Sequence, residues 1–301
     1  MPIYLFPLAL LLITFYAQAQ SLVVLGNLQD GGSPHIGCNR ECCKTTAEEK
    51  KVVALGLLDH SSEKTWLIEA TPDISAQLRL LKSFGKSDNP SGVNGIFLTH
   101  AHIGHYGGLM FLGKEALGAN AIPVYGLAGM TNFLTTNGPW SQLVNQKNII
   151  LKNLVPDIPL VLSDKLKITA FRVPHRDEFS ETAGFIIEGP SKKVLFIPDI
   201  DKWEKWDRDI SALIKQVNIA LIDGTFYSNA EIGYRDPSAI PHPLVSESIE
   251  KFNSLNLSDR KKIYFIHLNH TNPLLKKESA ELKKMKGAGF NLAEFGMRIE
   301  L

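Results

Sequence analysis

The chain has 301 residues, of which 44% are hydrophobic and 21% are charged, and its 32 basic and 31 acidic residues leave a net charge of +1. This composition excludes a chain that is disordered throughout, because there is enough apolar material for a sizeable core. The balanced charge also argues against nucleic acid as a partner, since nucleic-acid-binding domains are usually clearly basic.

The first 19 residues predict an export signal. Residues 3–16 are almost wholly apolar, and Ala17-Gln18-Ala19 follows them as a small-x-small cleavage site. No Lys or Arg precedes the apolar run, so a buried first strand or helix is the alternative interpretation. We expect a signal peptide at 1–19 and a mature domain at 20–301. The mature chain is expected to be periplasmic or secreted, with no membrane attachment after cleavage.

Strands and helices alternate along the rest of the chain. Short apolar, β-branched runs predict strands at 22–25, 52–58, 65–70, 95–99, 122–126, 160–173, 183–188, 193–198, 219–222 and 261–266. Apolar residues at helical spacing predict helices at 73–84, 128–136, 210–216, 245–255 and 276–286. A polar turn at 59–63 joins two of the strands as a hairpin. This mixture predicts one α/β domain with mixed sheets.

Three histidines, His100, His102 and His105, follow the apolar strand at 95–99. Residues two apart on an extended segment share a face, so His100 and His102 can point together. Neutral imidazole is a common ligand of zinc. The whole chain has only 9 His, so three in one short window favour a metal site over a chance cluster on the surface.

The segment His100-Ala101-His102-Ile103-Gly104-His105 resembles the His-x-His-x-Asp-His signature of the metallo-β-lactamase superfamily. The resemblance continues in the same order at 173–175, 194–199 and 266–270. Within the superfamily it is closest to the coenzyme PQQ synthesis protein B group, and it spans nearly the whole mature chain. The resemblance implies a four-layer αββα sandwich with mixed sheets.

The same resemblance implies ligands for two metal ions. The first ion would be held by His100, His102 and His175. The second would take His105 and His267, and Asp199 would bridge the two ions. Asp201 competes with Asp199 for the bridging role, but Asp199 directly follows the strand and is preferred.

Gly104 stands where the family motif has an aspartate, and glycine has no side chain with which to bind a metal. Three outcomes follow from this departure. In the first, the second ion is held weakly. In the second, another carboxylate replaces the missing ligand, with Asp223 as the candidate. In the third, the second metal is a different one, such as iron. On this reasoning, Gly104→Asp is expected to raise the occupancy of the second site.

All three cysteines lie in the Cys loop, residues 38–43. In the related families this loop carries Cys-x-Cys-x-x-Cys and looks like a structural zinc site completed by a histidine, which corresponds to His270 here. Arg40 stands where a Cys is expected, so Cys42 would join Cys38 and Cys43 as a ligand. A disulfide from Cys38 to Cys42 or Cys43 is the alternative, as export would favour.

The leading hypothesis for function is a metal-dependent hydrolase that uses metal-bound hydroxide on an ester, amide or phosphodiester. One or two zinc ions are expected in the active site, with Asp199 as a catalytic residue. His242 is the candidate proton donor, and a solvated loop histidine is its alternative interpretation. The rival hypotheses are a PQQ-synthesis-B-like non-haem iron oxygenase acting on a tyrosine-containing peptide and a non-catalytic metal-binding protein. The expected partner is a small-molecule or peptide substrate.

Overall fold

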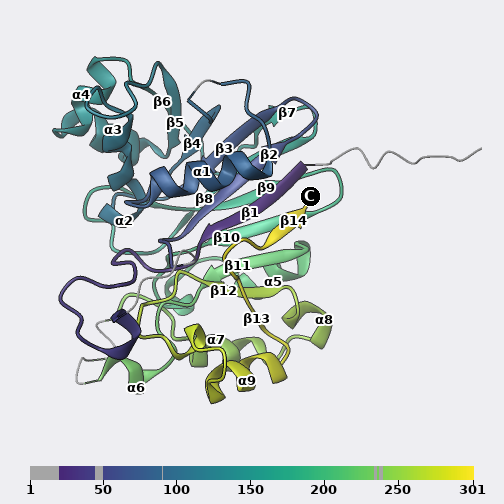
Figure 1. Cartoon of the computed structure of the whole chain (residues 1–301). Coiled ribbons are helices and arrows are strands. Elements are labelled where there is room, and N and C mark those ends of the chain that lie inside the picture. Colours follow the sequence, from purple (N-terminus) through teal and green to yellow (C-terminus); the bar gives the residue numbers. More distant parts are fainter. Residues whose placement is uncertain (1–19, 45–49, 90, 234–235, 237–239) are drawn as a thin grey trace, which may run out of the picture.

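Two seven-stranded sheets organise the computed structural model of this chain, which describes residues 20–44, 50–89, 91–233, 236 and 240–301 (Figure 1). The expected signal peptide at 1–19 lies outside these residues. None of the helices in the described part of the chain has the length and apolar character that a membrane span requires.

The first sheet has the strand order β14-β1-β2-β3-β4-β5-β6 and the second has the order β13-β12-β11-β10-β9-β8-β7. The strands of the first sheet are β1 (Gln20–Gly26), β2 (Ala54–Asp59), β3 (Lys64–Ile68), β4 (Gly95–Phe97), β5 (Ile122–Gly126), β6 (Ile149–Asn153) and β14 (Arg298–Glu300). Those of the second are β7 (Leu160–Ser163), β8 (Leu166–Val173), β9 (Thr182–Glu188), β10 (Lys193–Ile197), β11 (Ile219–Asp223), β12 (Ile263–Ile266) and β13 (Asn291–Leu292).

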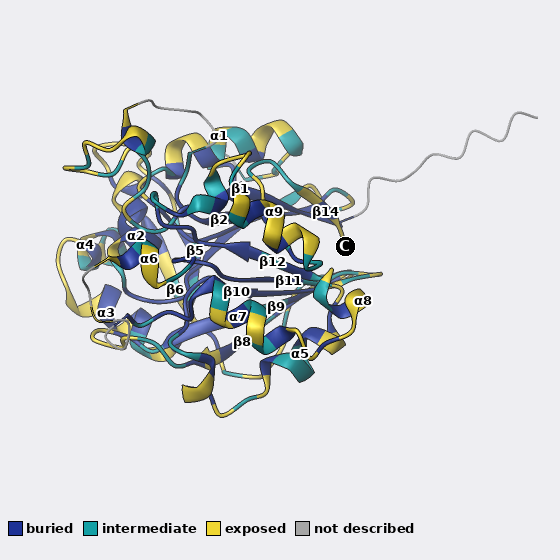
Figure 2. Ribbon diagram, turned by 90° about the horizontal axis from the view of Figure 1, so that it is seen from below, coloured by how far each residue is buried: buried dark blue, intermediate teal, exposed yellow. Residues whose placement is uncertain are grey.

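The strands are apolar on both faces because both faces of each sheet are covered. In β1, Leu22 and Val24 pack into the core between the two sheets, whereas Val23 and Leu25 pack against the helices outside the first sheet. All four side chains are buried. Successive side chains of the strand therefore point into two different cores, and neither face is turned to solvent. Figure 2 shows the strands as the buried centre of the molecule.

Helices cover the outer face of each sheet, which makes four layers (Figure 1). The helices beside the first sheet include α1 (Ile74–Phe84), α3 (Ala128–Thr136) and α4 (Trp140–Asn145), and those beside the second include α5 (Ile210–Gln216), α7 (Val245–Phe252) and α9 (Ala280–Gly287). Three one-turn helices, α2 (Ile103–Tyr106), α6 (Asn229–Ile232) and α8 (Leu257–Arg260), lie in connections. The predicted αββα sandwich with mixed sheets is confirmed.

The structure differs from the sequence-based expectation in a few elements. The strand β6 was not expected, because its residues are mostly exposed and carry a weak apolar pattern. The helix expected at 276–286 begins only at Ala280, because the Ser279 side chain accepts a hydrogen bond from the Leu282 backbone N–H and caps the first turn. The expected hairpin of β2 and β3 is confirmed by their antiparallel pairing.

Strand direction brings the ends of many strands to one edge. In the first sheet β1 and β3 are each antiparallel to β2, and β4 is parallel to β3, so all three end on the same side. In the second sheet β8, β10, β11 and β12 likewise run in one direction. The carboxyl ends of strands are where ligands bind in open α/β sheets. The loops that follow these strands therefore form the place to look for a functional site.

Candidate metal centre

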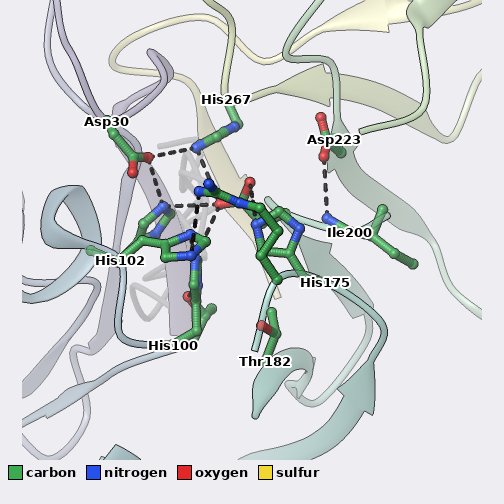
Figure 3. A network of polar contacts seen from close by, with 12 residues as sticks. Asp30, His100, His102, His175, Thr182, Ile200, Asp223 and His267 are labelled. Carbon is green, nitrogen blue, oxygen red and sulfur yellow. Dashed lines mark hydrogen bonds and ion pairs between the residues drawn. The ribbon is translucent and has the colours of Figure 1, made fainter. Parts of the chain in front are cut away.

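The first cluster consists of His100, His102 and His175, whose ligand atoms all lie within 4.8 Å of one another. His100 follows β4 and His175 follows β8, so the cluster draws on both sheets. Nε2 of His100 lies 2.7 Å from Nδ1 of His102. Figure 3 shows the three rings turned toward a common point.

The outer nitrogens of two of these rings have partners that set the tautomer. Nδ1 of His100 lies 2.9 Å from the Thr99 hydroxyl, and Nε2 of His102 lies 3.0 Å from the Glu178 carboxylate. When these nitrogens donate outward, the lone pairs of the other two nitrogens face into the cluster. An outer hydrogen bond of this kind orients histidine ligands in metal sites.

His175 completes the first cluster with both ring nitrogens buried. Among the residues that the structure describes, neither of these nitrogens has a hydrogen-bond partner. Burial lowers the pKa of His175 to about 4, and burial together with neighbouring His105 lowers the pKa of His100 well below its ordinary value. Both imidazoles are thereby held neutral, which is the form that binds a metal.

The second cluster consists of Asp30, His105, Asp199 and His267. Oδ1 of Asp30 lies 2.9 Å from Nε2 of His105 and 3.1 Å from Nε2 of His267. Burial alone raises the pKa of Asp30, but the two imidazoles more than offset this and hold it well below its ordinary range. Figure 3 shows Asp30 and His267 facing each other across this cluster.

The histidines of the second cluster also have partners on their far side. Nδ1 of His105 lies 3.3 Å from the buried carboxylate of Glu69, and Nδ1 of His267 lies 2.8 Å from the Thr225 hydroxyl. His267 has a positive φ of 63°, a backbone state that costs a non-glycine residue about 1–3 kcal/mol and is held by its surroundings. Such strain is common where a side chain must be aimed at a site.

Asp199 lies between the two clusters. Its Oδ2 is 2.9 Å from Nε2 of His105 and 3.2 Å from Nε2 of His267, and its Oδ1 is 3.8 Å from Nε2 of His175. The competing residue Asp201 points elsewhere, since its carboxylate pairs with Lys205 at 2.7 Å. The geometry thus favours Asp199 over Asp201 for the bridging position.

His242 and Asp223 form a buried pair beside the two clusters. Nδ1 of His242 lies 2.8 Å from Oδ2 of Asp223 and 3.5 Å from Oδ1 of Asp199. Burial lowers the pKa of His242, but Asp223 more than offsets this and raises it above its ordinary value. The Asp223 carboxylate also accepts hydrogen bonds from the backbone N–H groups of Ile200 and Thr225. These contacts indicate that Asp223 positions His242. A carboxylate oxygen of Asp223 also lies within 4.8 Å of a ring nitrogen of His267.

The Cys loop brings all three thiols to His270. The sulfur atoms of Cys38, Cys42 and Cys43 and a ring nitrogen of His270 lie within 4.8 Å of one another, and the three cysteines are free thiols. Nδ1 of His270 lies 3.0 Å from Oδ1 of Asn269 and its ring stacks on that of His35. Three thiols and one imidazole are a donor set suited to tetrahedral zinc. Cys42 thus lies with the other three donors, although its position in the sequence differs from the Cys-x-Cys-x-x-Cys pattern.

Three carboxylates near the histidines, Asp30, Glu69 and Glu178, were not among the residues expected from the sequence. Asp30 follows β1, and Glu69 follows β3 directly, so both lie at the carboxyl ends of strands that share an edge with β4. That position was their only signal in the sequence. Glu178 lies in a loop between β8 and β9, where the sequence offers no comparable signal.

The residues of both clusters fit a bound metal. Neutral imidazoles and carboxylates are ligands of zinc and of iron. Both ring nitrogens of His175 are buried and have no hydrogen-bond partner among the described residues, and buried polar atoms seldom remain so. A metal cofactor would satisfy these atoms.

Comparison with known proteins shows which family this chain resembles. The model of the beta-lactamase superfamily domain matches residues 64–268, more than half of the chain. Coenzyme PQQ synthesis protein B of Methylobacillus flagellatus is 27% identical over 92% of this chain and 99% of its own length. The protein of the same name from Xanthomonas euvesicatoria is 25% identical over 93% of this chain and 99% of its own length.

Solved structures share the fold at lower identity. PqqB from Methylobacterium extorquens superposes with a TM-score of 0.77 at 20% identity, covering 93% of this chain and all of its own. A diphosphatase from the PhnP family gives a TM-score of 0.67 at 20% identity, with 94% and 97% covered. Human tRNase Z, short form, gives 0.56 at 16% identity, with 93% and 98% covered. The chain belongs to the metallo-β-lactamase superfamily, and within it the chain is similar to coenzyme PQQ synthesis protein B.

Proposed function

We propose that this protein is a two-metal hydrolase that cleaves an ester, amide or phosphodiester. The observation that carries the proposal is the position of Asp199, whose carboxylate lies within 4 Å of histidines from both clusters. If each cluster held an ion, the pair would act on the attacking and the leaving oxygen of a displacement, as in two-metal hydrolases.

Zinc is the metal we propose for both clusters, with a further structural zinc in the Cys loop. The donor atoms suit zinc, and the related PqqB structure from Methylobacterium extorquens is described as bound to Zn²⁺. When bound, zinc would act as a Lewis acid on a carbonyl or phosphoryl oxygen and would lower the pKa of a water molecule to about 7.

The protein's own residues supply orientation and a proton. Asp223 holds His242 by Nδ1, which leaves Nε2 as the nitrogen free of that carboxylate. The His242 ring centroid lies 5.2 Å from that of His175 and 6.0 Å from that of His267, so it borders both clusters. We propose that His242 donates a proton to the leaving group, since histidine is the side chain that most often serves in general acid–base catalysis.

Export and substrate class are part of the same proposal. The apolar run at 3–16 and the Ala17-Gln18-Ala19 segment support a periplasmic or secreted location. The net charge of +1 supports a small-molecule or peptide substrate over a nucleic acid, because a nearly neutral chain offers no general attraction for a polyanion. We also propose that the mature chain has no membrane attachment.

A non-haem iron oxygenase acting on a tyrosine-containing peptide is the second candidate. Within the second cluster, His105, His267 and Asp30 make a set of two histidines and one carboxylate, which non-haem iron oxygenases use. The sequence relatives that take part in coenzyme PQQ synthesis also favour it. The hydrolase is preferred because Asp199 connects the second cluster to a first cluster made of histidines alone.

Metal analysis combined with turnover tests the proposal. The purified mature chain is expected to contain zinc and to cleave at least one of a panel of chromogenic esters, amides and phosphodiesters. Iron together with dioxygen consumption would instead establish the oxygenase. Bound metal without turnover on the panel, and without dioxygen consumption, would support the non-catalytic protein. Copurified metal should be compared after expression in zinc-supplemented and iron-supplemented medium.

A further inference from the structure

We infer that Asp30, from the loop after β1, is a carboxylate ligand of the second metal and replaces the aspartate that the His-x-His-x-Asp-His motif lacks at Gly104. The inference rests on the proposed metal centre but not on hydrolysis. It restores a full set of protein ligands to the second cluster, with two imidazoles and two carboxylates, while the motif itself contributes only His105.

The position of the Asp30 carboxylate is that of a ligand. Its Oδ1 lies 2.9 Å from Nε2 of His105 and 3.1 Å from Nε2 of His267. Both of those imidazoles have their Nδ1 directed away from Asp30, toward Glu69 and Thr225 respectively. The three side chains therefore present their remaining donor atoms to one point, together with Oδ2 of Asp199.

A side chain at position 104 would need the space that Asp30 already fills. A Cβ atom added at Gly104 would lie 2.6 Å from Cα, Cβ and Cγ of Asp30, closer than side-chain atoms approach each other. Gly104 is helical and does not have a positive φ, so its backbone gives no reason of its own for a glycine. The absence of a side chain at 104 is what allows the Asp30 side chain to reach the histidines.

The backbone just before Asp30 is held against the segment after β12 that contains His267. The Gln29 N–H donates to the Leu268 carbonyl at 2.9 Å, and Leu28 forms a bridge with Leu268. The Gly32 N–H donates to the Gln29 carbonyl at 2.8 Å and closes a turn around Asp30. The carboxylate is therefore held in place by an ordered turn. A ligand that is already ordered binds more tightly, because metal binding does not have to bear the entropic cost of ordering it.

This arrangement reverses the expectation for Gly104→Asp. The sequence motif predicts a gain of metal at the second site, whereas the structure places the new side chain in collision with Asp30. Gly104→Asp alone is therefore expected to lose the second metal. Combined with Asp30→Gly, which removes the obstructing side chain, the same substitution is expected to restore it.

Zinc binding to the full mature chain tests the inference directly. After removal of metal with a chelator, Zn²⁺ alone is titrated by calorimetry into the wild type, Asp30→Asn and the control Glu278→Gln. Glu278 is exposed and pairs with Lys283 at 2.9 Å, so it offers a carboxylate that belongs to none of the three candidate metal sites. Asp30→Asn should bind one zinc fewer than the wild type, or bind it more than ~100-fold more weakly, which exceeds the 10–100-fold loss typical of an outer-sphere partner. Glu278→Gln should match the wild type.

The double variant protects the test against misfolding. If Asp30→Asn alters the far-ultraviolet circular dichroism, the comparison moves to Gly104→Asp and the pair Asp30→Gly with Gly104→Asp. Recovery of the wild-type zinc number in the pair, but not in Gly104→Asp, supports exchange of one carboxylate for the other. Wild-type zinc number and affinity in Asp30→Asn would overturn the inference, and so would a wild type with no second zinc beside His105. A wild type with both ions but no hydrolysis would overturn the proposed function and leave this inference standing.

Discussion

The first and second clusters lie side by side but are assembled in different ways. Two of the three histidines in the first cluster are two positions apart, after one strand. The second cluster takes its four residues from the loops after β1, β4, β10 and β12. The first cluster is therefore largely a local feature of one loop, whereas the second depends on the alignment of both sheets. Substitutions should separate these two kinds of site.

The largest effect is expected from His102→Ala in the first cluster. A metal acting as a Lewis acid is worth several kcal/mol, and about 1.36 kcal/mol corresponds to a tenfold change in rate, so activity should fall at least ~10³-fold. One zinc should also be lost, measured by metal analysis of the same sample. His60→Ala is the matched control, because His60 is half-buried near Ser21 and Arg298 and outside both clusters. Retained activity in His102→Ala would mean that the first cluster is not the catalytic centre.

The second-largest loss of activity is expected from His242→Ala. This change removes the proposed proton donor and leaves all residues of the first and second clusters in place. General acid catalysis typically contributes 10²–10⁴-fold, so kcat should fall by about that factor while zinc content stays at the wild-type value. Substrates with leaving groups that need no protonation should lose much less. An equal loss for good and poor leaving groups would rule out proton donation and would point to His242 as a metal ligand instead.

Glu178→Gln should weaken the first cluster alone. Glu178 orients His102 through Nε2, and loss of such an outer partner typically costs 10–100-fold in metal affinity or activity. Competition with a zinc-binding dye measures the change. Glu188→Gln is the control, since that carboxylate forms an ion pair with Lys193 at 2.7 Å and belongs to neither cluster. A change in the affinity of the second cluster instead of the first would contradict the assignment of Glu178.

The Cys loop supplies a third, structural site against which both clusters can be compared. If the Cys loop holds zinc, its three thiols should react with a thiol reagent only after the metal is removed. A disulfide would leave one reactive thiol with or without a chelator. Cys43→Ser should release one zinc and lower the melting temperature by a few degrees, roughly the effect of 1 kcal/mol in a domain of this size. Zinc in the first cluster should remain.

The smallest effect is expected from Asp201→Asn, two residues after the bridging Asp199. Asp201 pairs with exposed Lys205, and such surface pairs contribute about 0–1 kcal/mol. Zinc number and kcat should equal those of the wild type, whereas Asp199→Asn should lose both. A loss of zinc in Asp201→Asn would mean that the two aspartates have been assigned to the wrong roles.

Much of the fold could be predicted because local patterns report local structure. The strand Ile122–Gly126 and the helices Ala128–Thr136 and Ile210–Gln216 have the predicted bounds. The exposed edge strand Ile149–Asn153 was missed, because its pairing with β5, and not its apolar pattern, makes it a strand. Element boundaries depend on such contacts and on caps like Ser279, which the periodicity of apolar residues does not record.

By itself, the sequence determined which histidines gather after β4, because a metal motif on one loop is set by spacing along the chain. The resemblance to the superfamily motif also marked His175, Asp199 and His267 as ligands, and Gly104 as the position where a ligand is missing. Only the tertiary structure decided what fills that gap. Asp30 is 74 positions before Gly104, and it reaches the second cluster because β1 and β4 run in the same direction and end at the same edge of the sheet. Strand order and direction arise from packing over the whole domain, so no local pattern around Asp30 could identify it as a ligand.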